Sequence, residues 1–155
     1  MAPTAPLWFE SIPAHPASRD AAAALQRRTA SLAPVAVRSY FVVCAMEGWR
    51  RVQVDQLVAW SGVPPATLKR RLAAAGVTPA GVAAWNLALH AAWLLDVAAL
   101  PAGAAVSCMR LARGSALRAV LGARGVRLAA GRVEPGAFAA TLERYAAVLR
   151  AAFPQ

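Results

Sequence analysis

Basic side chains gather in two stretches of the chain, and these side chains are the best equipped for chemistry. Lys69, Arg70 and Arg71 are adjacent. The second stretch has no acidic residue and contains six arginines: Arg110, Arg113, Arg118, Arg124, Arg127 and Arg132. A guanidinium forms bidentate pairs with phosphate or with the edge of guanine, and an ammonium acts as a point charge. We therefore expect an anionic partner, with a solvated basic surface as the alternative for each stretch.

The charge of the whole chain agrees with this expectation. Seventeen Lys and Arg face seven Asp and Glu among 155 residues, so the net charge is +10. Such a charge favours nucleic acid or an acidic membrane surface as partner. GC-rich codon bias is an alternative source of the sixteen arginines and 41 alanines. However, nine of the 17 cations fall in 69–71 and 110–132, a placement that codon bias does not explain.

The elements that position these cations are predicted to be helices, because alanine is the best helix former and is depleted in strands. We therefore expect an all-α fold. Prolines and glycines punctuate the chain and set the expected boundaries. The predicted helices cover residues 18–31 (with Ser18 as N-cap), 35–47, 54–61, 64–75, 79–97, 101–111, 115–123 and 137–152.

The same boundaries predict a domain organisation with two helix-turn-helix units. Leu7, Trp8 and Phe9, in the proline-rich start of the chain, are candidates to dock on the body. The predicted regions are a Pro-rich tail (1–16), an N-terminal helical region (17–50), a first helix-turn-helix with a linker helix (51–97), a second, degenerate helix-turn-helix (98–132) and a C-terminal helix (133–155).

The first unit has a glycine, Gly62, where two short helices must turn. Leu68 and Leu72 are four residues apart in the second of these helices, so both are expected to face the core. Apolar anchors behind an arc of hydrogen-bond donors are typical of a DNA recognition helix. The residues predicted on the outward arc are Ala66, Thr67, Lys69, Arg70 and Arg71.

The second unit carries a weaker version of this pattern. Leu117 and Leu121 would pack one helix against Cys108 and Leu111 of the helix before it. The candidate DNA contacts of this unit are Arg113, Ser115, Arg118, Arg124 and Arg127.

The order and spacing of these motifs resemble the DNA-binding domain of AraC-type (AraC/XylS-like) transcriptional regulators, in divergent form. The resemblance rests on Leu68-Lys-Arg70-Arg-Leu72, on Gly76, and on Ala91-Ala-Trp-Leu94-Leu95. It implies tandem helix-turn-helix subdomains joined by a long linker helix, with Ala66, Lys69 and Arg70 at base-reading positions. The second unit lacks the usual aromatic residues, and the linker helix is almost apolar. We expect a typical effector domain to be absent or reduced to helices.

The predicted linker helix is so apolar that a membrane span, a buried core helix and a ligand pocket must each be considered for it. No charged residue occurs from Leu72 to Leu95, a span long enough to cross a bilayer, but Gly76 and Pro79 divide it. We expect no membrane segment, and we expect this helix to be covered either by the extra helices of the chain or by a second copy or a protein partner. Trp85, Leu89 and Trp93 are predicted to form an apolar stripe that faces the core. The alternative is a ligand pocket beside Asn86 and His90.

Catalytic and cofactor motifs are missing from the sequence. The two histidines (His15 and His90) are far apart, and so are the two cysteines (Cys44 and Cys108), which read as core residues. We therefore expect no enzyme, no metal and no cofactor. The leading expectation is a bacterial, cytoplasmic regulator that binds double-stranded DNA. The alternative is a helical protein–protein interaction module with a regulator-like fold that has lost DNA readout.

Overall fold

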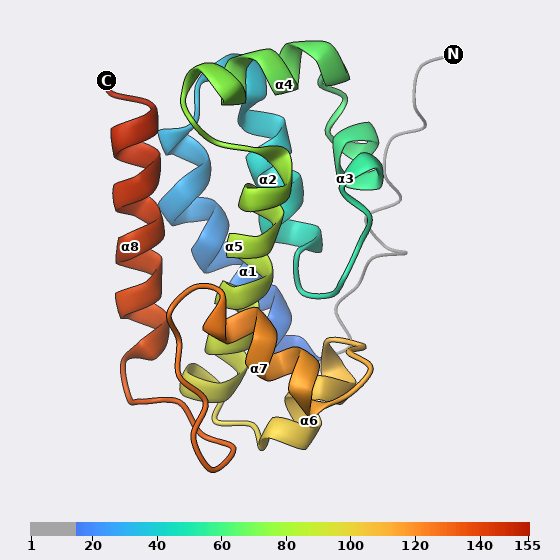
Figure 1. The fold of residues 1–155 in the computed structure, drawn as a ribbon, viewed down its shortest axis with the longest axis vertical. Helices are drawn as coiled ribbons and strands as arrows, with labels where there is room; N and C mark the ends of the chain where they lie inside the picture. Colours follow the sequence, from blue (N-terminus) through green and yellow to red (C-terminus); the bar gives the residue numbers. More distant parts are fainter. Residues whose placement is uncertain (1–14) are drawn as a thin grey trace.

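The computed structural model describes residues 15–155, and this part of the chain is all-helical, as predicted (Figure 1). Short 3-10 segments, Ala30–Leu32 and Val35–Val37, join the first two helices, and a π-helical turn, Trp93–Val97, extends the fifth. The α-helices are α1 (Pro16–Thr29), α2 (Arg38–Glu47), α3 (Val54–Ser61), α4 (Pro65–Ala74), α5 (Pro79–Ala92), α6 (Ala102–Cys108), α7 (Gly114–Gly122) and α8 (Ala137–Ala152).

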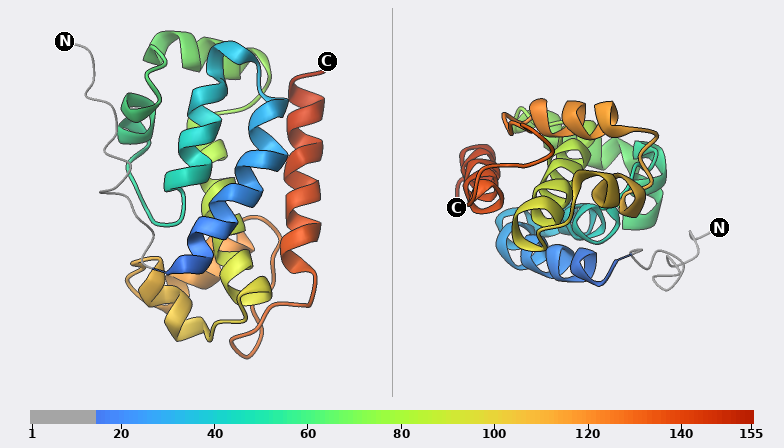
Figure 2. Two further views of the ribbon diagram at one scale, coloured as in Figure 1. Left: turned by 180° about the vertical axis from the view of Figure 1, so that it is seen from behind. Right: turned by 90° about the horizontal axis from the view of Figure 1, so that it is seen from below.

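Helix α5 runs through the middle of the protein and is covered by helices of the same chain. It packs against α1, α2, α7 and α8. Seen along the long axis, α1 and α7 lie on opposite sides of α5, and α8 lies at a third side (Figure 2). The predicted core stripe is confirmed: Leu89 is fully buried, Trp85 stacks on Tyr145, and Trp93 meets Phe138 edge to face. Of the two expected ways to cover this apolar helix, the structure uses the extra helices of the chain.

This central position gives the apolar sequence of α5 a role in the core. The segment Pro79–Val97 is long and apolar enough, by length and composition alone, to cross a membrane, and 50% of it is buried inside the protein. A helix that is apolar on all sides is expected in the core of a protein as well as in a bilayer. Its packing against four neighbouring helices therefore accounts for its composition.

The start of the first helix differs from the prediction. Helix α1 begins at Pro16, and the imidazole Nδ1 of His15 accepts a hydrogen bond from the backbone amide of Ala17 at 3.1 Å. Ser18 is therefore not the N-cap; it is fully buried, with its hydroxyl 3.6 Å from the Cys108 sulfur. A proline at the first helical position is favourable because its missing N–H has no partner there anyway. The predicted docking of Leu7, Trp8 and Phe9 lies outside the described residues.

The other boundaries agree with the sequence to within a few residues. Helices α3 and α8 match their predicted ranges, whereas the helix predicted over 35–47 begins with a 3-10 segment, and α6 is shorter at both ends than predicted. The helix predicted over 79–97 widens into the π-helical turn at Trp93, where the amide of Ala98 bonds to the carbonyl of Trp93 at 3.0 Å.

The π-helical turn carries the residue that anchors the C-terminal helix. The carboxylate of Asp96 accepts hydrogen bonds from the backbone amides of Gly136 (3.2 Å) and Phe138 (2.9 Å), at the N-terminus of α8. The N-cap residue of α8, Gly136, has no side chain to cap the helix, so Asp96 satisfies two of the amides there and places a negative charge at the positive end of the helix dipole. Residues about 40 positions apart in sequence thus fix α8 against α5.

Candidate nucleic-acid interface

Helices α3 and α4, the first helix pair, meet at a tight turn. Gly62 ends α3 with φ +73°, a left-handed conformation that side chains other than glycine rarely adopt. The hydroxyl of Ser61 bonds to the carbonyl of Val58 and accepts from the amide of Val63, which closes the turn. Pro65 then occupies the first position of α4. The turn predicted at Gly62 is confirmed.

Helix α4 buries one face and exposes the opposite one. Leu68 and Leu72 are fully buried, as their spacing predicted. The helix ends where Gly76 takes φ +73°, and the amides of Gly76 and Val77 bond back to the carbonyls of Ala73 and Leu72. Of the predicted outward residues, Thr67 is half-buried, and the following are exposed: Ala66, Lys69, Arg70 and Arg71.

The cations of α4 have no partner within residues 15–155. Lys69, Arg70 and Arg71 make no hydrogen bond or ion pair with any described residue. For comparison, Arg28 on α1 is paired with Glu143 on α8. Three adjacent unpaired positive charges repel one another, so an anion bound here would lower the electrostatic energy.

Hollows lie on both sides of α4 and could take parts of an anionic partner. Arg70 and Arg71 border a hollow of about 400 Å³, together with Pro34 and Phe153. Lys69 borders a smaller hollow of about 170 Å³ between α3 and α4. Helix α4 lies at one end of the molecule (Figure 1).

Helices α6 and α7 form the second helix pair, and the end of α6 is tied to the segment between α2 and α3 through a buried tryptophan. Trp49 follows α2 and is 1% exposed. The guanidinium carbons of Arg50 and Arg110 lie 5.3 and 5.4 Å from the centre of its ring, within cation–π range. Arg110 lies just after α6 with φ +54°. This contact could not be predicted from the sequence, because no local sequence pattern relates positions 49 and 110.

The residues predicted to pack the second pair are buried, and most of its predicted DNA contacts are exposed. Leu117 and Leu121 are fully buried, as expected. On the outward side, Arg113 and Ser115 at the start of α7, Arg118 and, beyond the helix, Arg127 are all exposed. None of these arginines has a hydrogen-bonding or ionic partner in residues 15–155.

Arg124 differs from these residues because its side chain is already occupied. Its guanidinium lies 4.7 Å from the centre of the Trp85 ring and donates to the carbonyl of Gly81 at 3.3 Å. Trp85 in turn stacks on Tyr145 at 5.2 Å. Partial burial lowers the pKa of this guanidinium. The side chain thus joins α7, α5 and α8, and we exclude it from the candidate interface.

The polar pair on α5 is buried and lines no cavity that the structure describes. The side-chain amide of Asn86 donates to the carbonyl of Val82 at 2.9 Å. His90 is fully buried, and its Nε2 lies 2.8 Å from the carbonyl oxygen of Ala45, so this nitrogen carries the proton. The other ring nitrogen, Nδ1, is buried without a hydrogen-bond partner. His90 is therefore a core residue that joins α5 to α2.

Because His90 is buried in its neutral form, the protein is expected to lose stability in mild acid. Burial lowers the pKa of His90 from 6.5 to about 4. Because the unfolded chain takes up the proton first, the free energy of unfolding should fall as the pH drops from about 7.5 to 4.5, by about 2–3 kcal/mol from this residue. Urea unfolding at the two pH values measures the loss. His90→Gln should have a smaller pH dependence by that amount, and an unchanged pH dependence would contradict this assignment.

The described residues show neither an exposed, reactive cysteine nor a cluster of metal ligands. Both cysteines are buried and free, and burial raises the pKa of Cys44 to about 12, so its thiol stays protonated. Within residues 15–155, no group of three or more His, Cys, Asp or Glu side chains is placed to hold a metal ion.

Comparison with protein-family models, curated proteins and solved structures finds no match to this chain. The candidate interface is therefore defined by its own geometry and charge. It consists of an exposed, unpaired basic face on α4 and a second one around α7.

Proposed function

We propose that this protein binds double-stranded DNA through α4 and α7 and regulates transcription in the manner of an AraC-like regulator. The observation that carries the proposal is the division of α4: two fully buried leucines anchor it, and Lys69, Arg70 and Arg71 are exposed and unpaired. A recognition helix requires such an anchored face and such a row of donors.

The order of the helices supports the same proposal. A helix of 14 residues, α5, lies between two pairs of shorter helices, and each pair ends in an exposed helix with basic side chains. Helix α4 lies at one end of the molecule and α7 towards the other (Figure 1).

In the proposed mechanism, the two basic faces have different tasks. The arginines around α7, Arg113, Arg118 and Arg127, bind phosphates and release counterions, which supplies affinity without sequence preference. On α4, Lys69 and Arg70 reach base edges in the major groove, where a guanidinium bonds to guanine O6 and N7. Ala66 offers only a methyl group, which suits an apolar contact with thymine.

The division of tasks predicts the effect of a single substitution. Arg70→Ala should weaken binding to a preferred site by about 5- to 160-fold, which corresponds to about 1–3 kcal/mol, and should relax the preference at one base pair. The preferred site is obtained by selecting bound sequences from random duplex DNA. The matched control is Arg19→Ala, an exposed arginine on α1, the helix that lies on the side of α5 opposite to α7 (Figure 2), and it should leave affinity and preference unchanged. If Arg70→Ala weakens all sequences equally, Arg70 is only a phosphate contact.

A second candidate function follows from the structural use of Arg124. Because this arginine is engaged with Trp85 and Gly81, the second helix pair offers fewer free donors than its sequence suggests. A helical interaction module without DNA readout is therefore the alternative. The same selection separates the two proposals, because an interaction module enriches no sequence and does not shift random duplex at low salt.

A further inference from the structure

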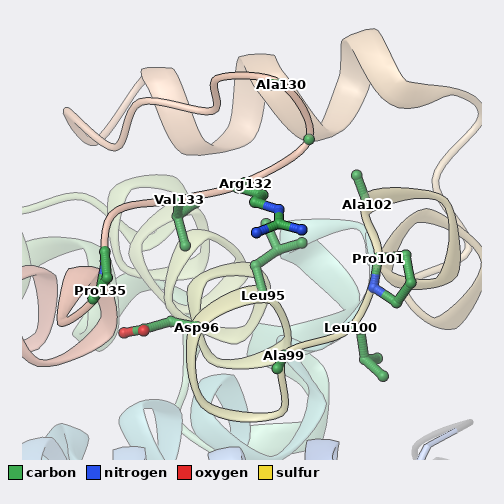
Figure 3. Close-up of a pocket in the computed structure, with 11 residues that line it drawn as sticks. Leu95, Asp96, Ala99, Leu100, Pro101, Ala102, Ala130, Arg132, Val133 and Pro135 are labelled. Atoms are coloured by element: carbon green, nitrogen blue, oxygen red, sulfur yellow. The ribbon is translucent and has the colours of Figure 1, made fainter.

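A cavity of about 570 Å³ is lined by no residue of α4 or α7. It is bordered by the segment that joins α5 to α6 and by the segment that joins α7 to α8 (Figure 3). Its volume falls in the range of small-molecule sites, about 300–1,000 Å³. No part of the proposed DNA-binding mechanism uses this cavity.

The walls combine apolar side chains with two charged groups. Leu95, Leu100 and Val133 supply apolar surface. Asp96 borders the cavity, but its carboxylate oxygens accept hydrogen bonds from the backbone amides of Gly136 and Phe138 at the start of α8, so they are already engaged. In Figure 3 this carboxylate is turned towards Pro135, at the edge of the group.

Arg132 is the second charged group, and its charge is uncompensated. Its side chain lies in the middle of the lining residues in Figure 3. The guanidinium makes no hydrogen bond or ion pair with any residue in 15–155. The cavity thus combines one free planar cation with apolar walls, which are the two features needed to hold an amphipathic anion.

The backbone around the cavity is held in unusual conformations. Ala99 and Ala130, which line opposite segments, have φ angles of +54° and +52°, in the left-handed region that alanine disfavours. Leu95 and Asp96 come from the π-helical turn that extends α5. Left-handed residues other than glycine and single π-helical turns both concentrate at ligand sites. Left-handed backbone and a π-helical turn therefore both occur at the border of this cavity.

We propose that this cavity binds a small organic carboxylate. The guanidinium of Arg132 pairs with the carboxylate group in a bidentate fashion, which matches the planar geometry of both groups. Leu95, Leu100 and Val133 enclose the apolar body of the ligand. The site does not depend on DNA binding, so it stands or fails separately from the proposed function.

The test uses the full chain and two pairs of probes that differ only in charge: hexanoate against hexanamide, and benzoate against benzamide. Binding is followed by NMR, through the backbone amides of Leu95, Ala99 and Arg132, with each probe titrated into the millimolar range. At least one carboxylate should shift these three amides in a saturable way. Its amide should bind at least tenfold more weakly, because it lacks the charge that Arg132 compensates.

Two variants complete the test. Arg132→Gln keeps a planar polar side chain but loses the charge, so it should weaken carboxylate binding at least tenfold. The matched control is Arg19→Gln, another exposed arginine that does not line this cavity, and it should bind the carboxylate like the unmodified protein. Both replaced side chains are exposed, so melting temperatures near that of the unmodified protein are expected and checked first. The proposal is overturned if no carboxylate shifts the three amides, if the amides bind as tightly, or if binding survives Arg132→Gln.

Discussion

Replacing Lys69, Arg70 and Arg71 together by glutamine is expected to weaken binding to duplex DNA of random sequence about 500-fold at about 0.1 M salt. On random sequence the three side chains have no preferred base to read and contact phosphates instead. Each phosphate neutralised by a cation contributes about 0.9 to the slope of log K against log salt, so three cations contribute about 2.7, which corresponds to this factor at about 0.1 M salt. All three side chains are exposed and unpaired, so the fold should be unaffected. Fluorescence anisotropy with labelled duplex DNA over a range of salt concentrations measures both affinity and slope.

The control for this variant removes cations from another surface. Arg19 and Arg27 are exposed on α1, which lies on the side of α5 opposite to α7 (Figure 2). The double variant Arg19→Gln/Arg27→Gln should change the affinity less than about threefold and leave the salt slope the same within error. An equal loss per removed charge in the two variants would mean that DNA responds to net charge alone and that α4 has no special place in binding.

The second large effect concerns the centre of the core. Leu89 is fully buried on α5, the helix that α1, α2, α7 and α8 all contact. Leu89→Ala should lower the free energy of unfolding by about 2–5 kcal/mol, because it removes buried methyl groups and leaves a cavity that four packed helices cannot easily close. In a protein of this size, that loss lowers the melting temperature by about 4–20 °C. Urea unfolding and thermal melts measure the two quantities.

Val97→Ala is the matched control for Leu89. Val97 ends the π-helical turn that continues α5, and it is 52% exposed. A substitution at so exposed a position is expected to change the free energy of unfolding by no more than about 0.5 kcal/mol. If Leu89→Ala is as mild as this control, α5 is not the tightly packed centre of the protein.

The sequence predicted the helices well because their signals are local. Proline and glycine mark the ends of α3, α4 and α5, and the spacing of Leu68 and Leu72 identified the buried face of α4. These signals depend on residues within one or two turns of one another. They predicted which cations would be exposed on α4 without any knowledge of the tertiary structure.

Contacts between distant residues were beyond the reach of these signals. Arg124 looked like the other arginines of its stretch, but it packs on Trp85, 39 positions earlier in the chain. Ser18 looked like an N-cap, but burial against Cys108 and the cap from His15 displaced it. Likewise, Asp96 capping α8 and the cavity beside Arg132 exist only because the chain returns after α7 to the end of α5. Each depends on tertiary packing, which single-sequence periodicity does not encode.

The most direct test of the central claim is the salt dependence of binding between the unmodified protein and duplex DNA. If about five phosphates are neutralised by the faces of α4 and α7, log K should fall with log salt at a slope of about −4 to −5. Such a slope, together with its reduction by about 2.7 in the variant that lacks Lys69, Arg70 and Arg71, is the result that the account predicts. A binding constant that does not change with salt, or no binding at low salt, would contradict it.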